Sequence, residues 1–148
     1  MFVSKDFTFD AAHFLTKYHG KCEHLHGHTY KLRVTVEGKV QANGLVIDFV
    51  ILKKIVKEQI LNKYDHRCFN DFFENPTAEV IAKAIWEELV DLPSLLKSEA
   101  DDPNMPEEIK RLLKDGSGEA AKEVNEEVRL HEIQLWETQN SFVTYRGD

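Results

Sequence analysis

Apolar and polar residues alternate along two stretches near the beginning of the chain. In residues 2–13, one parity is formed by Val3, Phe7, Phe9, Ala11 and His13, and the other by Ser4, Asp6, Thr8 and Asp10. Residues 26–37 repeat the alternation, with one face formed by His26, His28, Tyr30, Leu32, Val34 and Val36. A period of two is typical of a strand with one buried face. The pattern therefore predicts two strands, separated by a polar loop that contains Gly20.

A helical period follows Asp48, which is a favourable residue for an N-cap. The apolar positions of this predicted helix are Leu52, Ile55, Val56 and Ile60. Residues 62–76 are irregular and end at Asn75-Pro76. Thr77 is suited to cap a second helix, whose predicted buried face consists of Val80, Ile81, Ala84, Ile85 and Leu89.

Residues 92–127 differ in composition from the rest. They contain Pro93, Pro103, Pro106 and Gly116-Ser117-Gly118, together with many charged residues. We interpret this stretch as an insertion or lid, with short amphipathic helices around 106–114 and 118–126. Its role stays open between a lid, a contact between subunits and a decoration, of which decoration is the default.

Two further strands are predicted at 128–137 and 141–146, joined by a turn near Gln139-Asn140. The resulting order predicts one α+β domain over residues 1–148, with a four-stranded antiparallel sheet and two helices packed on one face. The edge strands of such a sheet favour oligomerisation, because unpaired edges are a liability.

Composition restricts the class of protein. The chain has 148 residues, of which 42% are hydrophobic and 30% charged, as in soluble globular domains. No apolar run reaches the ~20 residues of a membrane span, and the first residues lack the apolar core of a secretory signal. We therefore expect a cytoplasmic protein without a membrane partner. The net charge of -7 disfavours a nucleic-acid partner, which normally requires a basic face.

The charge is unevenly distributed. Residues 1–70 contain 11 basic and 7 acidic residues, whereas residues 71–148 contain 8 basic and 19 acidic ones. An anionic ligand is therefore expected to meet the first half, where Lys17, Lys21 and Lys31 are candidates to hold it. The acidic half is interpreted as solvated helix surface.

Three histidines form the strongest candidate site. His26 and His28 are two residues apart, so both side chains project from the same face of the second strand. His13 ends the first strand on its inward parity, and an antiparallel pairing brings it alongside. Three imidazoles leave the fourth position of a tetrahedral site open, as in catalytic zinc sites. Copper, iron and nickel also suit imidazole, and His19 and His24 remain competing ligands.

Other candidate residues have several interpretations. Cys22 lies four residues before His26 and fits a fourth ligand, a base or an inert thiol. The Asp65-His66 dipeptide fits an imidazole whose tautomer is fixed by a carboxylate, or a polar turn. Glu137, near the end of a predicted strand, fits either a carboxylate that accepts two hydrogen bonds from a ring edge or an exposed strand end.

Six segments occur together in an order typical of one enzyme family. They are Phe9-Asp10-Ala11-Ala12-His13, Cys22-x-x-x-His26-Gly27-His28-x-Tyr30, Val46-Ile47-Asp48-Phe49, Asp65-His66, Asn75-Pro76-Thr77-Ala78-Glu79 and Glu137-Thr138. Over residues 1–91 and 128–147 the chain resembles the 6-pyruvoyltetrahydropterin synthase family. The spacing of Cys22 and His26 is similar to that of its bacterial and archaeal branch, the 6-carboxytetrahydropterin synthases of queuosine biosynthesis.

The resemblance implies a role for each matching residue. The implied ligands of a catalytic Zn²⁺ ion are His13, His26 and His28. Cys22 is the implied general base, and the implied proton-transfer partners are Asp65 and His66. Glu137 is implied to anchor the pterin ring, and Thr77 to contact it. The implied architecture is the tunnelling fold (T-fold), assembled into a hexamer of two stacked trimers whose sheets join edge to edge.

The implied reaction converts 7,8-dihydroneopterin triphosphate to 6-carboxy-5,6,7,8-tetrahydropterin, acetaldehyde and triphosphate. Alternatives are 6-pyruvoyltetrahydropterin synthase activity, which keeps the side chain, and a non-catalytic zinc- or pterin-binding protein. A side-chain-cleaving variant that serves folate synthesis typically has glutamate in place of Cys22, so Cys22 counts against it. Ala78 stands where animal members have a second threonine, which leaves one pterin contact in question.

Overall fold

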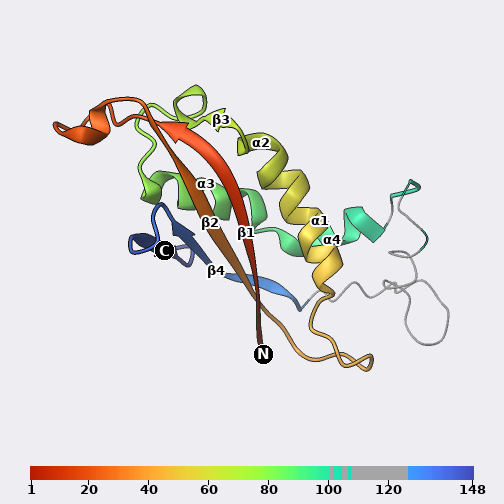
Figure 1. Cartoon of the computed structure of the whole chain (residues 1–148). Helices are drawn as coiled ribbons and strands as arrows, with labels where there is room; N and C mark the ends of the chain where they lie inside the picture. Colours follow the sequence, from red (N-terminus) through yellow and green to blue (C-terminus); the bar gives the residue numbers. More distant parts are fainter. Residues whose placement is uncertain (101, 105–106, 108–126) are drawn as a thin grey trace.

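The computed structural model describes residues 1–100, 102–104, 107 and 127–148 (Figure 1). A five-stranded sheet has the order β3-β1-β2-β4-β5. Its strands are β1 (Phe2–His13), β2 (His26–Glu37), β3 (Arg67–Cys68), β4 (Arg129–Trp136) and β5 (Phe142–Tyr145). The four strands expected from the sequence are present, and the pairs β1–β2, β2–β4 and β4–β5 are antiparallel. The predicted α+β class is thus confirmed.

The short strand β3 corrects the predicted four-stranded antiparallel sheet. Its two residues pair in parallel with Ala11 and Ala12 of β1, so the sheet has five strands and is mixed. A strand of two residues is too short to show an alternating pattern, and periodicity therefore gave no signal for it. The pairing brings the preceding Asp65-His66 dipeptide to the outer edge of β1.

The register of β1 and β2 aligns the inward faces of the two strands. Phe9 pairs with Tyr30, and His13 pairs with His26. The inward residues Phe9, Tyr30 and Leu32 are buried in the hydrophobic core, whereas Asp6 and Asp10 on the opposite face are exposed. One face of the sheet is therefore covered, and its apolar row continues into the row of histidines at the strand ends.

The helices supply the cover. They are α1 (Phe49–Val56), which continues as a π-helical turn (Lys57–Leu61) and α2 (Asn62–Tyr64), then α3 (Ala78–Leu89) and α4 (Leu92–Ala100). Both predicted caps are confirmed, since Asp48 Oδ1 accepts from Val50 N at 2.6 Å and Thr77 Oγ1 from Val80 N at 3.3 Å.

Two details of the helices differ from expectation. Val80 is 41% exposed. The buried face of α3 consists of Ile81, Ala82, Ile85 and Leu89. Val80 is one residue before Ile81, which turns its side chain by about 100° around the helix axis and away from this face. The prediction for Val80 was wrong. A further helix, α4, begins inside the predicted 92–127 insertion, and its Leu92 and Leu96 are part of the hydrophobic core.

Lys54 of α1 forms an ion pair with Glu99 of α4, whose pKa is raised mainly by burial. The helices expected around 106–114 and 118–126 fall on residues that, apart from 107, lie outside the described part of the chain.

No helix in the described part is long and apolar enough to span a membrane.

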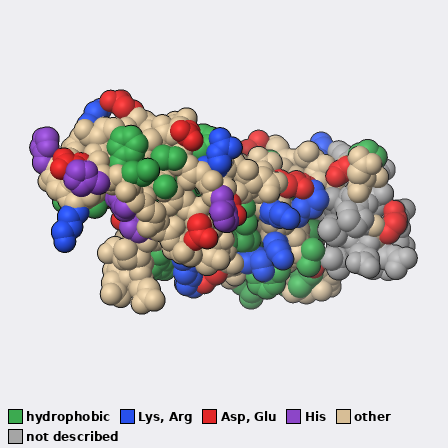
Figure 2. Space-filling view, turned by 45° about the horizontal axis from the view of Figure 1, so that its top comes forward, with side chains coloured by type: hydrophobic (Ala, Val, Ile, Leu, Met, Phe, Trp, Pro, Cys, Tyr) green, Lys and Arg blue, Asp and Glu red, His purple; other side chains and the backbone are tan. Residues whose placement is uncertain are grey.

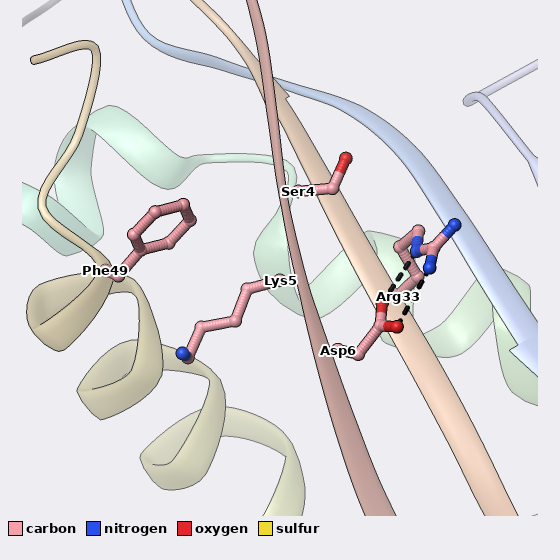
Figure 3. Close-up of a pocket in the computed structure, with 5 residues that line it drawn as sticks. All are labelled: Ser4, Lys5, Asp6, Arg33 and Phe49. Carbon is pink, nitrogen blue, oxygen red and sulfur yellow. Dashed lines mark hydrogen bonds and ion pairs between the residues drawn. The ribbon is translucent and has the colours of Figure 1, made fainter.

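A shallow depression lies toward the N-terminal end of β1. It is lined by Ser4, Lys5, Asp6, Arg33 and Phe49 (Figure 3). Lys5 points toward the start of α1, where its Nζ lies 5.4 Å from the ring centre of Phe49. Asp6, on the other side of β1, accepts two hydrogen bonds from Arg33 at 2.6 and 2.8 Å. None of the predicted site residues lines this depression.

Candidate active site

Three imidazoles converge where β1 and β2 meet the loops at one end of the sheet. Ring nitrogens of His13, His26 and His28 all lie within 4.8 Å of one another. His13 is 1% exposed, and the other two are half-buried. The space-filling view shows surface histidine side chains toward the left-hand end of the molecule and another near its middle (Figure 2). The strand parity and the antiparallel register together produce this convergence.

The hydrogen bonds of His13 and His26 define which ring nitrogen carries the proton. His13 Nδ1 lies 2.8 Å from the carbonyl oxygen of Pro76, and His26 Nδ1 lies 2.7 Å from that of His24. A carbonyl oxygen only accepts, so both Nδ1 atoms must donate. The Nε2 atoms of the two rings then face each other and are only 3.1 Å apart. Such an arrangement requires a cation between them, either a proton or a metal ion.

His28 adds a third donor atom in a similar state. Its Nε2 is buried and has no hydrogen-bond partner among the described residues. Burial lowers the pKa of His28, Glu137 opposes this shift, and repulsion from a proton on the neighbouring His13 or His26 adds to it. A neutral imidazole with an unpaired inward nitrogen is the ligand form of histidine. The three residues therefore fit Zn²⁺ held by three imidazoles with one position open.

Glu137 lies beside this cluster. Its Oε1 is 3.3 Å from His13 Nε2 and 3.8 Å from His28 Nε2. Glu137 directly follows β4, and its backbone N–H donates to Ser141 O at 3.1 Å, which closes the turn toward β5. The same carboxylate and, above all, burial raise the pKa of Tyr30, which is fully buried next to His13. The Glu137 carboxylate therefore lies close to the histidine cluster, and its side chain is still 28% exposed to solvent.

The alternative ligands are outside the cluster. The side chains of His19 and His24 are 104% and 83% exposed and lie near Glu23, at 4.0 and 3.8 Å. Cys22 belongs to the short 3-10 turn Lys21–Glu23, and its carbonyl oxygen accepts from Leu15 N at 2.8 Å. Its Sγ atom makes no hydrogen bond to any residue that the structure describes. Cys22 is half-buried and free of a disulfide.

Asp65 and His66 form a separate group at the outer edge of β1. Asp65 Oδ1 lies 2.9 Å from His66 Nδ1 and accepts from the backbone N–H of Asp10 at 3.0 Å. The backbone N–H of His66 donates to Asp10 O at 2.7 Å. His66 has a φ of 58°, a left-handed backbone conformation that is uncommon for residues other than glycine. Here the two bonds to Asp10 hold the backbone, and the carboxylate leaves His66 Nε2 as the proton-accepting atom.

Within one chain, the structure does not join this pair to Cys22. No hydrogen bond or ion pair among the described residues links them, and Asp65 and His66 cluster with Asp10, not with the three histidines. The candidate triphosphate ligands are also partly engaged, since Lys17 pairs with Glu74 at 3.2 Å and Lys31 with Asp6 at 3.0 Å.

Sequence reasoning missed the backbone contribution to the site. The carbonyl groups of Pro76 and His24 orient two of the three imidazoles. A backbone acceptor has no residue type of its own, so a motif search for ligands cannot find it. In the sequence, Asn75-Pro76 ends an irregular segment and belongs to one of the six family segments, and neither feature predicts a role for the Pro76 carbonyl.

Comparisons with known proteins identify similar sequences and structures. Residues 2–103 match the family model described as 6-pyruvoyl tetrahydropterin synthase. A 6-carboxy-5,6,7,8-tetrahydropterin synthase from Haemophilus influenzae is 33% identical over 150 aligned residues, covering 97% of each chain. A dihydroneopterin monophosphate aldolase from Pyrococcus furiosus is 44% identical over 82 residues, covering 55% of this chain and 68% of the relative. The structure of a 6-pyruvoyl tetrahydropterin synthase from Caenorhabditis elegans superposes with a TM-score of 0.68 at 25% identity, covering 100% of this chain and 96% of that one.

Proposed function

The chain belongs to the 6-pyruvoyl tetrahydropterin synthase family, and on this basis we propose that it is a zinc-dependent 6-carboxytetrahydropterin synthase. The proposed reaction is a carbon–carbon lyase reaction that consumes 7,8-dihydroneopterin triphosphate and one water molecule and yields 6-carboxy-5,6,7,8-tetrahydropterin, acetaldehyde and triphosphate. The observation that carries the proposal is the convergence of three imidazoles beside the carboxylate of Glu137. The relative that aligns along 97% of the chain supports this product over the alternatives.

His13, His26 and His28 are the proposed zinc ligands. The Pro76 and His24 carbonyls support this assignment, because they hold two of the rings with Nε2 facing inward. When bound, zinc supplies a Lewis acid that polarises oxygen atoms of the substrate side chain and makes the adjacent C–H more acidic. The half-buried position of the cluster supports the same role, because electrostatic effects are stronger where water is excluded.

Proton transfer is assigned to Cys22, Asp65 and His66. The carboxylate of Asp65 faces His66 Nδ1, which suits His66 Nε2 to accept and return a proton. Cys22 is the proposed general base that moves protons on the substrate side chain. Because one chain keeps the pair apart from Cys22, the proposal requires that they meet in the assembled protein. The proposed assembly is a hexamer of two stacked trimers, joined at sheet edges such as the uncovered edge of β1.

Substrate binding is assigned to Glu137 and Thr77. A carboxylate can accept two hydrogen bonds from the guanidine-like edge of a pterin ring. Glu137 is suited to this because its side chain is 28% exposed and accessible beside the histidines. Thr77 directly follows Pro76, whose carbonyl contacts His13, so it lies close to the metal site along the chain.

Two other activities have support from relatives. The Caenorhabditis elegans structure is that of a 6-pyruvoyl tetrahydropterin synthase, which favours triphosphate elimination without side-chain cleavage as the rival. The Pyrococcus furiosus relative is named as an aldolase, but it aligns with only 55% of this chain. A non-catalytic pterin-binding protein is the third alternative.

Release of inorganic triphosphate separates catalysis from binding alone. We expect the zinc-loaded protein to release triphosphate from 7,8-dihydroneopterin triphosphate, and the chelator-treated protein to release it only after zinc is restored. Binding of the substrate without triphosphate release contradicts the proposed lyase. Equal rates with and without zinc contradict the metal requirement.

A further inference from the structure

A set of side-chain hydrogen bonds fastens the segment before α3 to the chain that leaves β1. Asn75 Oδ1 accepts from the backbone N–H of Thr16 at 2.9 Å and from that of Lys17 at 3.3 Å. The hydroxyl of Thr16 donates to Glu74 O at 3.0 Å and lies 3.4 Å from the same Asn75 oxygen. The side-chain oxygen of Asn75 therefore holds the backbone of the turn that begins at Thr16, three residues after His13.

The next residue along the chain connects this fastening to the histidine cluster. Pro76 is buried, and its carbonyl oxygen lies 2.8 Å from His13 Nδ1. The proline ring fixes its own φ and restricts the backbone of the preceding residue, Asn75. The backbone N–H of Thr77 also donates to Asn75 O at 2.9 Å. Little rotational freedom is left between the side chain of Asn75 and the carbonyl of Pro76.

We propose that Asn75 is a positioning residue of the metal site, which holds the Pro76 carbonyl where it accepts the Nδ1–H of His13 and so directs His13 Nε2 toward the ion. This inference rests on the proposed metal site. Among the described residues, no hydrogen bond joins Asn75 to a histidine, so the proposed effect passes through the Pro76 carbonyl. Partners that hold the outer nitrogen of a ligating histidine fix its tautomer and orientation, and losing one typically costs about 10–100-fold in metal affinity.

A second asparagine, Asn70, holds the end of β1 independently of Asn75. Asn70 accepts from Phe14 N at 2.9 Å and donates to Phe14 O at 2.9 Å, which anchors the end of β1 directly after His13. The strand end therefore keeps its own anchor when Asn75 is changed. Loss of the Asn75 bonds releases the Pro76 carbonyl and leaves the backbone of His13 in place.

The test compares zinc affinity in three variants with the wild type. Asn75→Ala removes the acceptor. Asn75→Asp is the conservative variant. It keeps an oxygen at Oδ1, the side-chain atom of Asn75 that accepts the hydrogen bonds from Thr16 and Lys17. Asn43→Ala is the matched control, since Asn43 Oδ1 likewise accepts a backbone N–H, from Leu45 at 3.0 Å, in the loop before α1. Zinc affinity is measured by chelator competition, site geometry by the visible spectrum of the Co²⁺-substituted protein, and folding by the melting temperature without metal.

We expect Asn75→Ala to bind zinc about 10–100-fold more weakly and to change the Co²⁺ spectrum, whereas Asn75→Asp and Asn43→Ala match the wild type. Wild-type affinity in Asn75→Ala, with the wild type itself binding zinc, overturns the inference and leaves the proposed function intact. If the wild type binds no zinc, the metal site fails and the inference fails with it. Should Asn75→Ala not fold, Thr16→Val removes only the hydroxyl bonds to Glu74 and Asn75. A smaller loss of affinity then supports the inference, and an unchanged affinity overturns it.

Discussion

His13 Nε2 and His26 Nε2 lie 3.1 Å apart, while the Nδ1 atom of each ring contacts a carbonyl oxygen on its outer side. Two lone pairs cannot face each other at this distance without a cation between them. The arrangement is thus organised for a positive charge before any ligand arrives.

Loss of one proposed ligand should remove most of the metal. His28→Ala is expected to purify with much less zinc, because its buried Nε2 is the third inward donor. Zinc at 100 times its dissociation constant should stabilise the wild type by about 2.7 kcal/mol and the variant much less. Elemental analysis and thermal unfolding check both effects. His19→Ala is the control, since that side chain is 104% exposed; unchanged zinc in His28→Ala contradicts the ligand assignment.

Cys22 should be required for turnover but not for the metal. Cys22→Ala is expected to keep its zinc and its oligomeric state and to lose catalysis, because the proposed proton carrier is gone. Steady-state kinetics with elemental analysis tests this, and Cys68→Ala removes the other free thiol as a control. Undiminished turnover in Cys22→Ala excludes the residue from the mechanism.

The separation of Cys22 from the Asp65–His66 pair gives a test of assembly. If the proton carriers meet between subunits, co-expressed Cys22→Ala and His66→Ala chains should form mixed oligomers with activity that neither variant has alone. Activity assays on the purified mixed oligomer measure this. Absence of activity in confirmed mixed oligomers shows that the residues do not act across subunits.

Thr77 should have separable effects on stability and on substrate binding. Thr77→Ala removes the side chain that caps α3 and is expected to lower the free energy of unfolding by about 1 kcal/mol. Thr77→Ser keeps the hydroxyl and should restore most of it. Denaturant unfolding measures the cap, and KM measures the proposed pterin contact. A KM that is unchanged in Thr77→Ala removes Thr77 from substrate binding.

Asp6 should contribute pH-dependent stability. The hydrogen bonds from Arg33, helped by Lys31 and opposed by partial burial, lower the pKa of Asp6 from 3.8 to about 2. The folded protein therefore holds the ionised form more strongly, and the resulting stability is present above pH 3.8 and is lost as the pH falls toward about 2. Because the pair is exposed, Asp6→Asn should cost only about 0.5 kcal/mol at neutral pH.

Unfolding measurements on Asp6→Asn and the wild type at several pH values check this prediction. The difference between the two proteins should shrink on acidification, since the wild-type carboxyl also becomes neutral. A difference that stays constant across this range contradicts the assigned ion pair.

The sequence predicted the strands and the histidine cluster well, because both depend on side-chain parity. Residues 2–13 and 26–37 form the expected strands, and the inward parity of His13, His26 and His28 brings their imidazoles together. Local chemistry also identified the caps Asp48 and Thr77, whose side chains satisfy backbone groups within the next few residues.

Features that depend on long-range contacts could not be predicted in this way. β3 has only two residues, and the core role of Leu92 and Leu96 is visible only when α4 packs against the rest of the fold. The carbonyl of Pro76 orients His13 from 63 positions away. Asp65 and His66 lie at the outer edge of β1 because β3 pairs with β1. No pattern of residues in the sequence predicts this pairing.

Product identification by mass spectrometry tests the central claim most directly. The purified, zinc-loaded protein is incubated with 7,8-dihydroneopterin triphosphate, and pterins and volatile aldehydes are analysed together. The proposal predicts 6-carboxy-5,6,7,8-tetrahydropterin with acetaldehyde in equal amount. A 6-pyruvoyl product with the side chain retained and no acetaldehyde contradicts it.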